Sequence, residues 1–172
     1  GTGHAVLQAE PLLQGEAGTL LVTCGDTPLV TKETFTALIH CHEQSGAAAT
    51  VLTAHMPDPT GYGRVIRDEK GQVVKIVEQK DGTPEELAVD EVNAGIYCFD
   101  MSLLWDMLHN VTNDNAQGEY YLTDIIGMLV SAGKVVSAFA APSYAETLGV
   151  NSRQQMAEAE RVLRQRKLDE LM

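Results

Sequence analysis

Two uninterrupted apolar runs on either side of an amphipathic segment constrain this chain most. Residues 19–24 and 49–54 are rich in Leu, Val and Thr and show no apolar–polar alternation. Runs of this kind are typical of strands buried on both faces of a sheet. Between them, residues 31–45 carry apolar side chains three and four positions apart, with Thr31 as a capping residue and Gly46 as a stop. The order strand, helix, strand predicts a βαβ unit.

The rest of the chain continues this alternation. A hairpin is expected where two alternating segments flank the short polar break at residues 69–71. The remaining elements are predicted as strands at 90–100 and 134–140, and helices at 83–87, 103–108, 119–132 and 151–172. The last of these is expected to be a long, exposed amphipathic helix. The fold class is therefore α/β, with a mostly parallel sheet and an inserted hairpin.

Charge and length exclude several classes of function. The 172 residues fit one domain, and they carry 24 acidic against 12 basic side chains, a formal net charge of −12. An acidic chain has little to neutralise nucleic-acid phosphates or an anionic membrane surface, so neither is an expected partner. No apolar run reaches the ~20 residues that a membrane-spanning helix needs.

The cysteines point to a reducing compartment. There are three, none in a C-x-x-C spacing, so neither a disulfide framework nor a thiolate zinc site is expected. We therefore predict a cytoplasmic protein. Cys24 and Cys98 lie in apolar runs and are predicted to be buried.

Asp26 is the first candidate for chemistry. It follows the first buried strand directly, and ligands of open α/β sheets bind beyond the carboxyl ends of strands. A carboxylate there can hold Mg²⁺ while the ion keeps waters and grips substrate phosphates. The competing interpretation is an ordinary turn aspartate before Thr27 and Pro28.

Residues 1–5 suit either an anion or a nucleotide base; on local features alone, a turn before a helix is favoured.

Three further features could bind a sugar or phosphate. Residues 57–63 hold two prolines and two glycines close together, so the loop 58–64 must be rigid. Glu78 ends a strand and Asn93 lies inside another, and such side chains read hydroxyl and acetamido groups. Taken alone, a structural or solvated role is favoured for either residue. No nucleophilic triad or acid–base pair stands out, so an enzyme here would work by positioning and charge neutralisation, as in nucleotidyl transfer.

Seven segments together carry a family resemblance. In chain order they are residues 1–5, 25–29, 58–64, 76–81, 91–97, 115–124 and 149–153. Over almost the whole chain, this ordered set resembles the uridyltransferase domain of the bacterial bifunctional N-acetylglucosamine-1-phosphate uridyltransferase / glucosamine-1-phosphate acetyltransferase. The resemblance implies a Rossmann-like three-layer α/β/α nucleotide-diphospho-sugar transferase fold. It also implies that UTP and N-acetylglucosamine 1-phosphate are converted to UDP-N-acetylglucosamine and pyrophosphate, with Mg²⁺, for peptidoglycan and lipopolysaccharide precursors.

The resemblance also assigns roles to residues. It implies that Asp26 and Asn151 hold the metal ion and are catalytic. Gly1 and Thr2 would contact the uracil. The N-acetylglucosamine moiety would be bound by Gly63 (through its backbone), Glu78 and Asn93.

The family pattern extends beyond these residues. Its glycine-rich L-A-A-G-x-G-T-R-M loop, whose basic residues neutralise the triphosphate, does not occur here. Residues 1–150 are therefore expected to be a uridyltransferase domain incomplete at its N-terminus. Residues 151–172 would supply a metal ligand and a helix leading towards an absent C-terminal β-helix domain, which acetylates glucosamine 1-phosphate and forms a homotrimer.

We expect these 172 residues alone to be inactive. Two alternatives stay open: another sugar-1-phosphate nucleotidylyltransferase, acting for thymidylyl or guanylyl transfer, and a non-catalytic module that binds a sugar phosphate or nucleotide.

Overall fold

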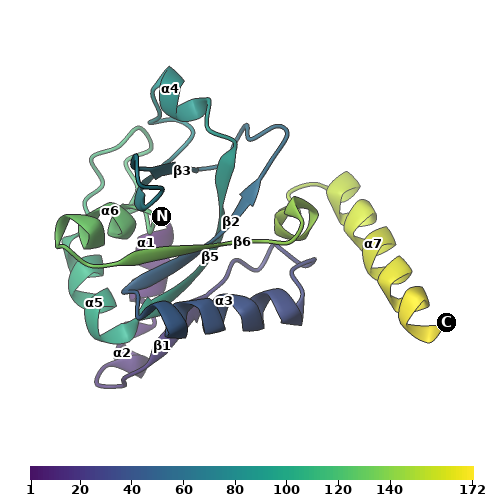
Figure 1. The fold of residues 1–172 in the computed structure, drawn as a ribbon, viewed down its shortest axis with the longest axis horizontal. Helices are drawn as coiled ribbons and strands as arrows, with labels where there is room; N and C mark the ends of the chain where they lie inside the picture. Colours follow the sequence, from purple (N-terminus) through teal and green to yellow (C-terminus); the bar gives the residue numbers. More distant parts are fainter.

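Strands β2 (Ala49–His55) and β5 (Glu91–Asp100) form the centre of a six-stranded sheet in the computed structural model, which describes all 172 residues (Figure 1). Strand β6 (Val136–Ala140) pairs with the outer edge of β2. The other edge of β5 carries β1 (Thr19–Val22) along its C-terminal half and β3 (Arg64–Arg67) near its start. β4 (Val73–Val77) pairs with β3 and completes the predicted hairpin.

Strand direction agrees with the prediction, but the pairing is more mixed than a mostly parallel sheet suggests. β1, β2 and β3 all run antiparallel to β5, and β6 runs parallel to β2, so four of the six strands point the same way. β5 lies among them and points the other way. As a result β2–β6 is the only parallel pair of neighbours.

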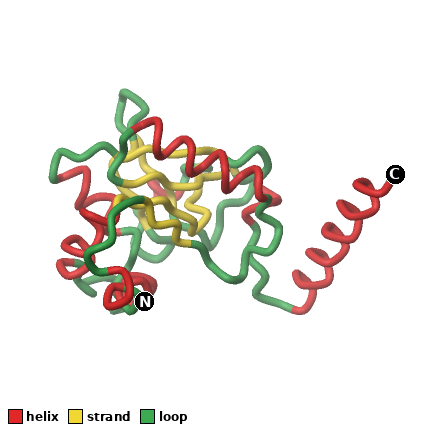
Figure 2. The backbone as a smooth tube through the Cα atoms, turned by 90° about the horizontal axis from the view of Figure 1, so that it is seen from below, coloured by secondary structure: helices red, strands yellow, loops and turns green.

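Helices cover both faces of the sheet, so the predicted three-layer α/β/α arrangement is confirmed. α3 (Lys32–Ser45) lies on one face, against a cluster that includes Leu38, Ile96 and Cys98. α1 (Thr2–Leu7), α5 (Met101–Asn110) and α6 (Asp124–Ser131) lie on the other. Figure 2 shows the strands between these two helical layers. Successive residues of β5 face opposite layers, which explains its apolar sequence.

The start and end of α3 follow the sequence. The Thr31 Oγ1 accepts a hydrogen bond from the Thr34 N–H at 3.2 Å, which satisfies one free amide of the first turn. Gly46 ends the helix in the left-handed conformation, with φ 58°. The short helix α4 (Pro84–Leu87) also begins as predicted, with a capping box between Thr83 and Glu86.

Two local predictions are wrong where the start of the chain contacts residues 120–122. Residues 1–5 were expected to precede a helix but lie largely within α1, and the helix expected at 119–132 begins only at Asp124. The Gly3 N–H donates to the Tyr120 carbonyl at 2.8 Å, and the Leu122 N–H donates to Thr2 Oγ1 at 3.0 Å. These tertiary bonds use backbone groups of 120–122 that a longer α6 would have needed.

The C-terminal helix α7 (Arg153–Leu171) is long and exposed, as predicted, and it projects away from the sheet (Figures 1 and 2). Only Ala159 in it is buried, and Arg166 donates to the Leu29 carbonyl at 2.7 Å. The short helices α2 (Glu10–Leu13) and η1 (Tyr144–Thr147) complete the fold. None of the helices combines the length and the apolar character needed to cross a membrane.

Candidate functional site

A cavity of about 200 Å³ opens where the edge of β5 has no strand beside it. β1 pairs with β5 from Tyr97 onward, and β3 pairs with it only at Val92. The interval between holds Asn93 and Gly95. The polar side chains that line the cavity are those of Thr2, Thr23, Cys24, Glu78, Asn93, Tyr97 and Thr123. Three predicted residues, Thr2, Glu78 and Asn93, therefore meet here from distant parts of the chain.

Glu78 enters the cavity directly after β4. Its Oε1 accepts a hydrogen bond from Thr123 Oγ1 at 2.9 Å. Burial raises the pKa of this carboxyl group; the Thr123 bond opposes the shift and the nearby Asp81 charge adds to it. Gly63 lies alongside, since a Cβ there would be 3.5 Å from Glu78 Oε2 and 3.1 Å from the Ile76 side chain. The absence of a side chain at Gly63 leaves its backbone close to the carboxylate.

Asn93 is oriented by its own strand. Its Nδ2 donates to the Tyr97 hydroxyl at 2.7 Å, and its Oδ1 accepts from the Gly95 N–H at 3.0 Å. Gly95 has φ 73°, a left-handed conformation that favours glycine. Burial raises the pKa of Tyr97, so its hydroxyl stays protonated. One N–H and one lone pair of the Asn93 amide remain for a ligand.

Asp26 and Asn151 meet at a second place, beyond the end of β1. The Val150 N–H donates to the Asp26 carbonyl at 2.7 Å, which ties the segment after η1 to the loop after β1. A Cβ on Gly149 would lie 3.3 Å from both Asp26 Oδ2 and Asn151 Nδ2. Those two atoms are therefore no farther apart than twice that distance, although 125 positions of sequence separate the residues.

This pair suits a hard divalent cation. A carboxylate and a carboxamide oxygen, which Asn151 presents after rotation of its amide, are ligands that Mg²⁺ takes. No group of three or more His, Cys, Asp or Glu side chains is arranged to hold a metal anywhere in the 172 residues. A cation here would therefore complete its shell with water and substrate phosphates, which is common for Mg²⁺.

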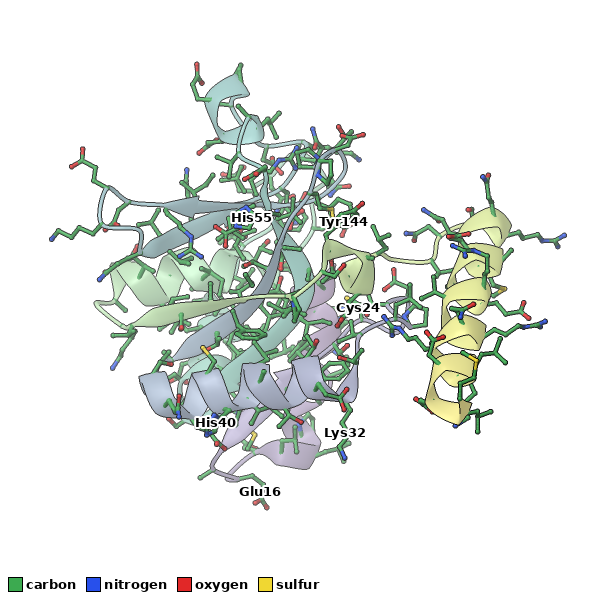
Figure 3. All side chains as sticks on the ribbon, turned by 45° about the vertical axis from the view of Figure 1, so that its right-hand side comes forward. Glu16, Cys24, Lys32, His40, His55 and Tyr144 are labelled. Atoms are coloured by element: carbon green, nitrogen blue, oxygen red, sulfur yellow. The ribbon has the colours of Figure 1, made fainter.

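Cys24 connects the two places. Its Sγ lines the cavity and donates to the Gly95 carbonyl at 3.5 Å. Asp26 follows two residues later, and its charge adds to burial in raising the Cys24 pKa. The prediction that Cys24 is buried is wrong, because β1 ends at Val22 and Cys24 lies in the loop beyond the strand, where it is exposed; Cys98 is buried as predicted. In Figure 3, Cys24 lies on the side of the body nearer α7.

Gly1 and Thr2 lie at the start of α1, next to the loop before α6. The Gly1 nitrogen is 3.7 Å from a Glu119 carboxylate oxygen, and Thr2 lines the cavity. A Cβ on Gly1 would come within 2.6 Å of the Tyr120 carbonyl oxygen, so the backbones are in close contact. Of these two residues, Thr2 therefore shares a cavity with Glu78 and Asn93.

Sequence reasoning missed Thr123, Tyr97 and Cys24. Tyr97 lies four positions after Asn93 on one strand, and an even spacing places two residues on the same face. That signal was available. Thr123 had no such signal, since only the tertiary fold brings α6 beside the end of β4.

Comparisons with known proteins agree with this geometry. Residues 1–147 match the model of the nucleotidyl transferase family. The bifunctional protein GlmU of Lactobacillus delbrueckii subsp. bulgaricus is 58% identical over 166 residues, covering 96% of this chain and 36% of that protein.

The bifunctional proteins GlmU of Lactobacillus johnsonii and Shouchella clausii are each 56% identical over all 172 residues, which cover 37% and 38% of those proteins. The chain thus spans little more than a third of the length of the curated relatives it matches. These matches confirm the resemblance inferred from the seven segments. The chain belongs to the nucleotidyl transferase family.

Proposed function

We propose that the protein carrying this chain forms UDP-N-acetylglucosamine and pyrophosphate from UTP and N-acetylglucosamine 1-phosphate. The observation that carries the proposal is the joint presence of the Glu78–Asn93 cavity and the Asp26–Asn151 pair, linked by the short segment from Cys24 to Asp26. The first place offers hydrogen-bonding side chains that could take neutral polar groups, and the second offers oxygen ligands that could take a cation with phosphates. A sugar phosphate and a nucleoside triphosphate need both.

The cavity supports recognition of the sugar. Glu78 is an acceptor for sugar hydroxyls, and Asn93 has a donor and an acceptor left for an acetamido or hydroxyl group. The backbone of Gly63 is close enough to take part in the same contact. A cavity of about 200 Å³ suits one pyranose ring better than a whole nucleotide.

Asp26 and Asn151 would hold Mg²⁺ at the phosphates, while Gly1 and Thr2 would contact the uracil. In the reaction, an oxygen of the sugar phosphate forms a bond to the α-phosphorus of UTP, and the bond from that phosphorus to the β-phosphate oxygen breaks. Pyrophosphate leaves with that electron pair. Mg²⁺ supplies neutralisation of charge on the phosphates. The chain contributes position, since Glu78, Asn93 and Gly63 fix the sugar relative to Asp26.

The family resemblance extends the proposal to the whole protein. Residues 1–150 would be the catalytic domain, and residues 151–172 a metal ligand followed by a connecting helix. The full-length protein would be a cytoplasmic homotrimer that also acetylates glucosamine 1-phosphate and supplies precursors for peptidoglycan and lipopolysaccharide. The exposed course of α7, away from the sheet, is consistent with a connecting role.

Pyrophosphate release tests the proposal. The full-length protein is incubated with Mg²⁺, UTP and N-acetylglucosamine 1-phosphate, and we expect release that requires both substrates and stops with a chelator. Competition by thymidine and guanosine triphosphates separates uridyl transfer from other sugar nucleotidylyltransferases. Binding without turnover would instead identify a non-catalytic module; the named relatives do not favour either alternative.

A further inference from the structure

Arg64 is the largest fully buried side chain in the structure, with 2% of its surface exposed. It begins β3, directly after the glycine loop 58–63, and forms no ion pair with any carboxylate. Its Nε is buried without a hydrogen-bond partner. With the hydrogen bonds from Thr60, its charge contributes to lowering the pKa of the exposed Asp58, but no carboxylate oxygen contacts the guanidinium group. A buried guanidinium group without such a contact is costly, so stability alone does not account for it.

The two terminal nitrogens of Arg64 bind two different parts of the site. Nη1 donates to the Tyr62 carbonyl, and Nη2 donates to Gln79 Oε1 at 3.0 Å. The same Gln79 oxygen accepts the Gly61 N–H at 2.9 Å. One planar cation thus joins the loop 58–63 to the residue that follows Glu78.

The two residues that Arg64 binds, Tyr62 and Gln79, are the immediate sequence neighbours of Gly63 and Glu78, the groups expected to face the sugar. Tyr62 precedes Gly63, whose carbonyl accepts the Asn93 N–H at 2.9 Å, and Gln79 follows Glu78. The loop has few other internal bonds: Asp58 Oδ1 accepts the Thr60 N–H at 3.1 Å and the Pro59 carbonyl accepts the Tyr62 N–H at 3.2 Å. Without Arg64, the bond from the Gly61 N–H would be the only one in this network that joins the loop to Gln79.

We propose that Arg64, acting with Gln79, is a positioning residue that fixes the positions of Gly63 and Glu78 relative to each other, so that both can contact the sugar. It does not touch the substrate. A lysine cannot replace it, since two acceptors in fixed directions need the planar fork of a guanidinium. The inference rests on the proposed function, because it concerns the same sugar subsite.

The test is a comparison of Michaelis constants in the full-length protein. For Arg64→Lys we expect the KM for N-acetylglucosamine 1-phosphate to rise about tenfold or more, as for loss of a charged hydrogen bond, with the KM for UTP within about twofold of wild type. Gln79→Leu removes the shared acceptor and should give the same selective rise. The double variant should be no worse than the worse single variant, because both break one network.

Arg67→Lys is the matched control. Arg67 lies three residues along the same strand and makes two hydrogen bonds of 2.7 Å to the Glu91 carboxylate, away from the cavity lining. We expect it to lower the melting temperature without changing the KM for the sugar phosphate.

The proposal is overturned if the sugar KM of Arg64→Lys and Gln79→Leu stays at the wild-type value, or if both KM values rise together in proportion to lost stability. If Arg64→Lys does not fold, Gln79→Leu decides alone. Absence of turnover in the wild type would contradict the proposed function instead, so the two failures are distinguishable.

Discussion

Glu78 and Asn93 are held by hydrogen bonds to Thr123, Tyr97 and Gly95, whereas the side chains of Asp26 and Asn151 are exposed. At the metal-side pair, the bonds are made by backbone: the Asp26 carbonyl accepts from Val150, and the Asn151 N–H donates to Gln155 Oε1 at 2.8 Å. The cavity is therefore organised by its own side chains, and the pair by the path of the backbone around it.

This difference follows from what each place would bind. A sugar offers neutral groups whose recognition depends on fixed directions, so ordering the side chains during folding reduces the entropy lost on binding. A cation needs available oxygen atoms, which internal hydrogen bonds would occupy. Substitutions at the cavity should then alter sugar affinity and stability together. Substitutions at the pair should alter turnover with little effect on stability.

Asp26→Ala should give the largest effect. Removing the only carboxylate of the pair leaves phosphate charge uncompensated, and we expect the rate of pyrophosphate release to fall by about 100- to 1000-fold. The melting temperature should change little, because the side chain is exposed. Asp106→Ala, an exposed carboxylate on α5, should keep the wild-type rate. Near-normal turnover of Asp26→Ala would remove this residue from the catalytic site.

Asn93→Ala should give the second largest effect, on sugar affinity. The change removes the ligand-facing amide and leaves the buried Tyr97 hydroxyl without its donor, so the KM for N-acetylglucosamine 1-phosphate should rise about 50-fold. The melting temperature should also fall, whereas we expect little change in melting temperature for Asp26→Ala. A rise in the KM for UTP alone would contradict the assignment of Asn93 to the sugar.

The two places also differed in how far sequence could predict them. The α/β alternation, the cap at Thr31 and the hairpin follow from local patterns, and the structure shows all three. Asp26 was identifiable locally, because it follows a buried strand. Its approach to Asn151 depends on how η1 packs after β6, which no periodicity encodes. The bonds from Thr2 and Gly3 to residues 120–122 likewise overrode the helical pattern at 119–123.

Gly149→Ala should have a moderate effect that tests the backbone control of the pair. Gly149 does not need glycine for its own conformation, because its φ is not positive. An added Cβ would lie 3.3 Å from both Asp26 Oδ2 and Asn151 Nδ2 and push them apart. We expect affinity for Mn²⁺, measured by electron paramagnetic resonance with UTP present, to weaken about tenfold, as for one misplaced charged contact.

Gly127→Ala is the control for that substitution. A Cβ there meets only the Lys75 side chain, at an ordinary 3.7 Å, in the middle of α6. It should raise stability by up to about 1 kcal/mol through helix propensity and leave Mn²⁺ affinity unchanged. Equal Mn²⁺ affinity in the two alanine variants would show that the pair is not set by the space at Gly149.

The smallest effect concerns the cost of keeping Glu78 in the cavity. Because burial raises its folded pKa above the ordinary value of 4.5, the unfolded chain loses this proton first as pH rises. Stability is then highest below about pH 4.5 and falls as pH rises through the raised folded pKa. Glu78→Gln keeps an acceptor for Thr123 but cannot ionise. Its melting temperature should match wild type near pH 4 and exceed it by about 2–4 °C at pH 7.

Asp58→Asn should show the opposite sign. Hydrogen bonds from Thr60 lower the pKa of Asp58, so the stability that this carboxylate contributes is present above its ordinary pKa and is lost as pH falls through the lowered one.

Parallel melting curves of Glu78→Gln and wild type from pH 4 to 7 would mean that the cavity does not penalise the carboxylate. If the curves diverge as expected while sugar affinity falls, the chain keeps a destabilising charge at this position because the ligand requires it.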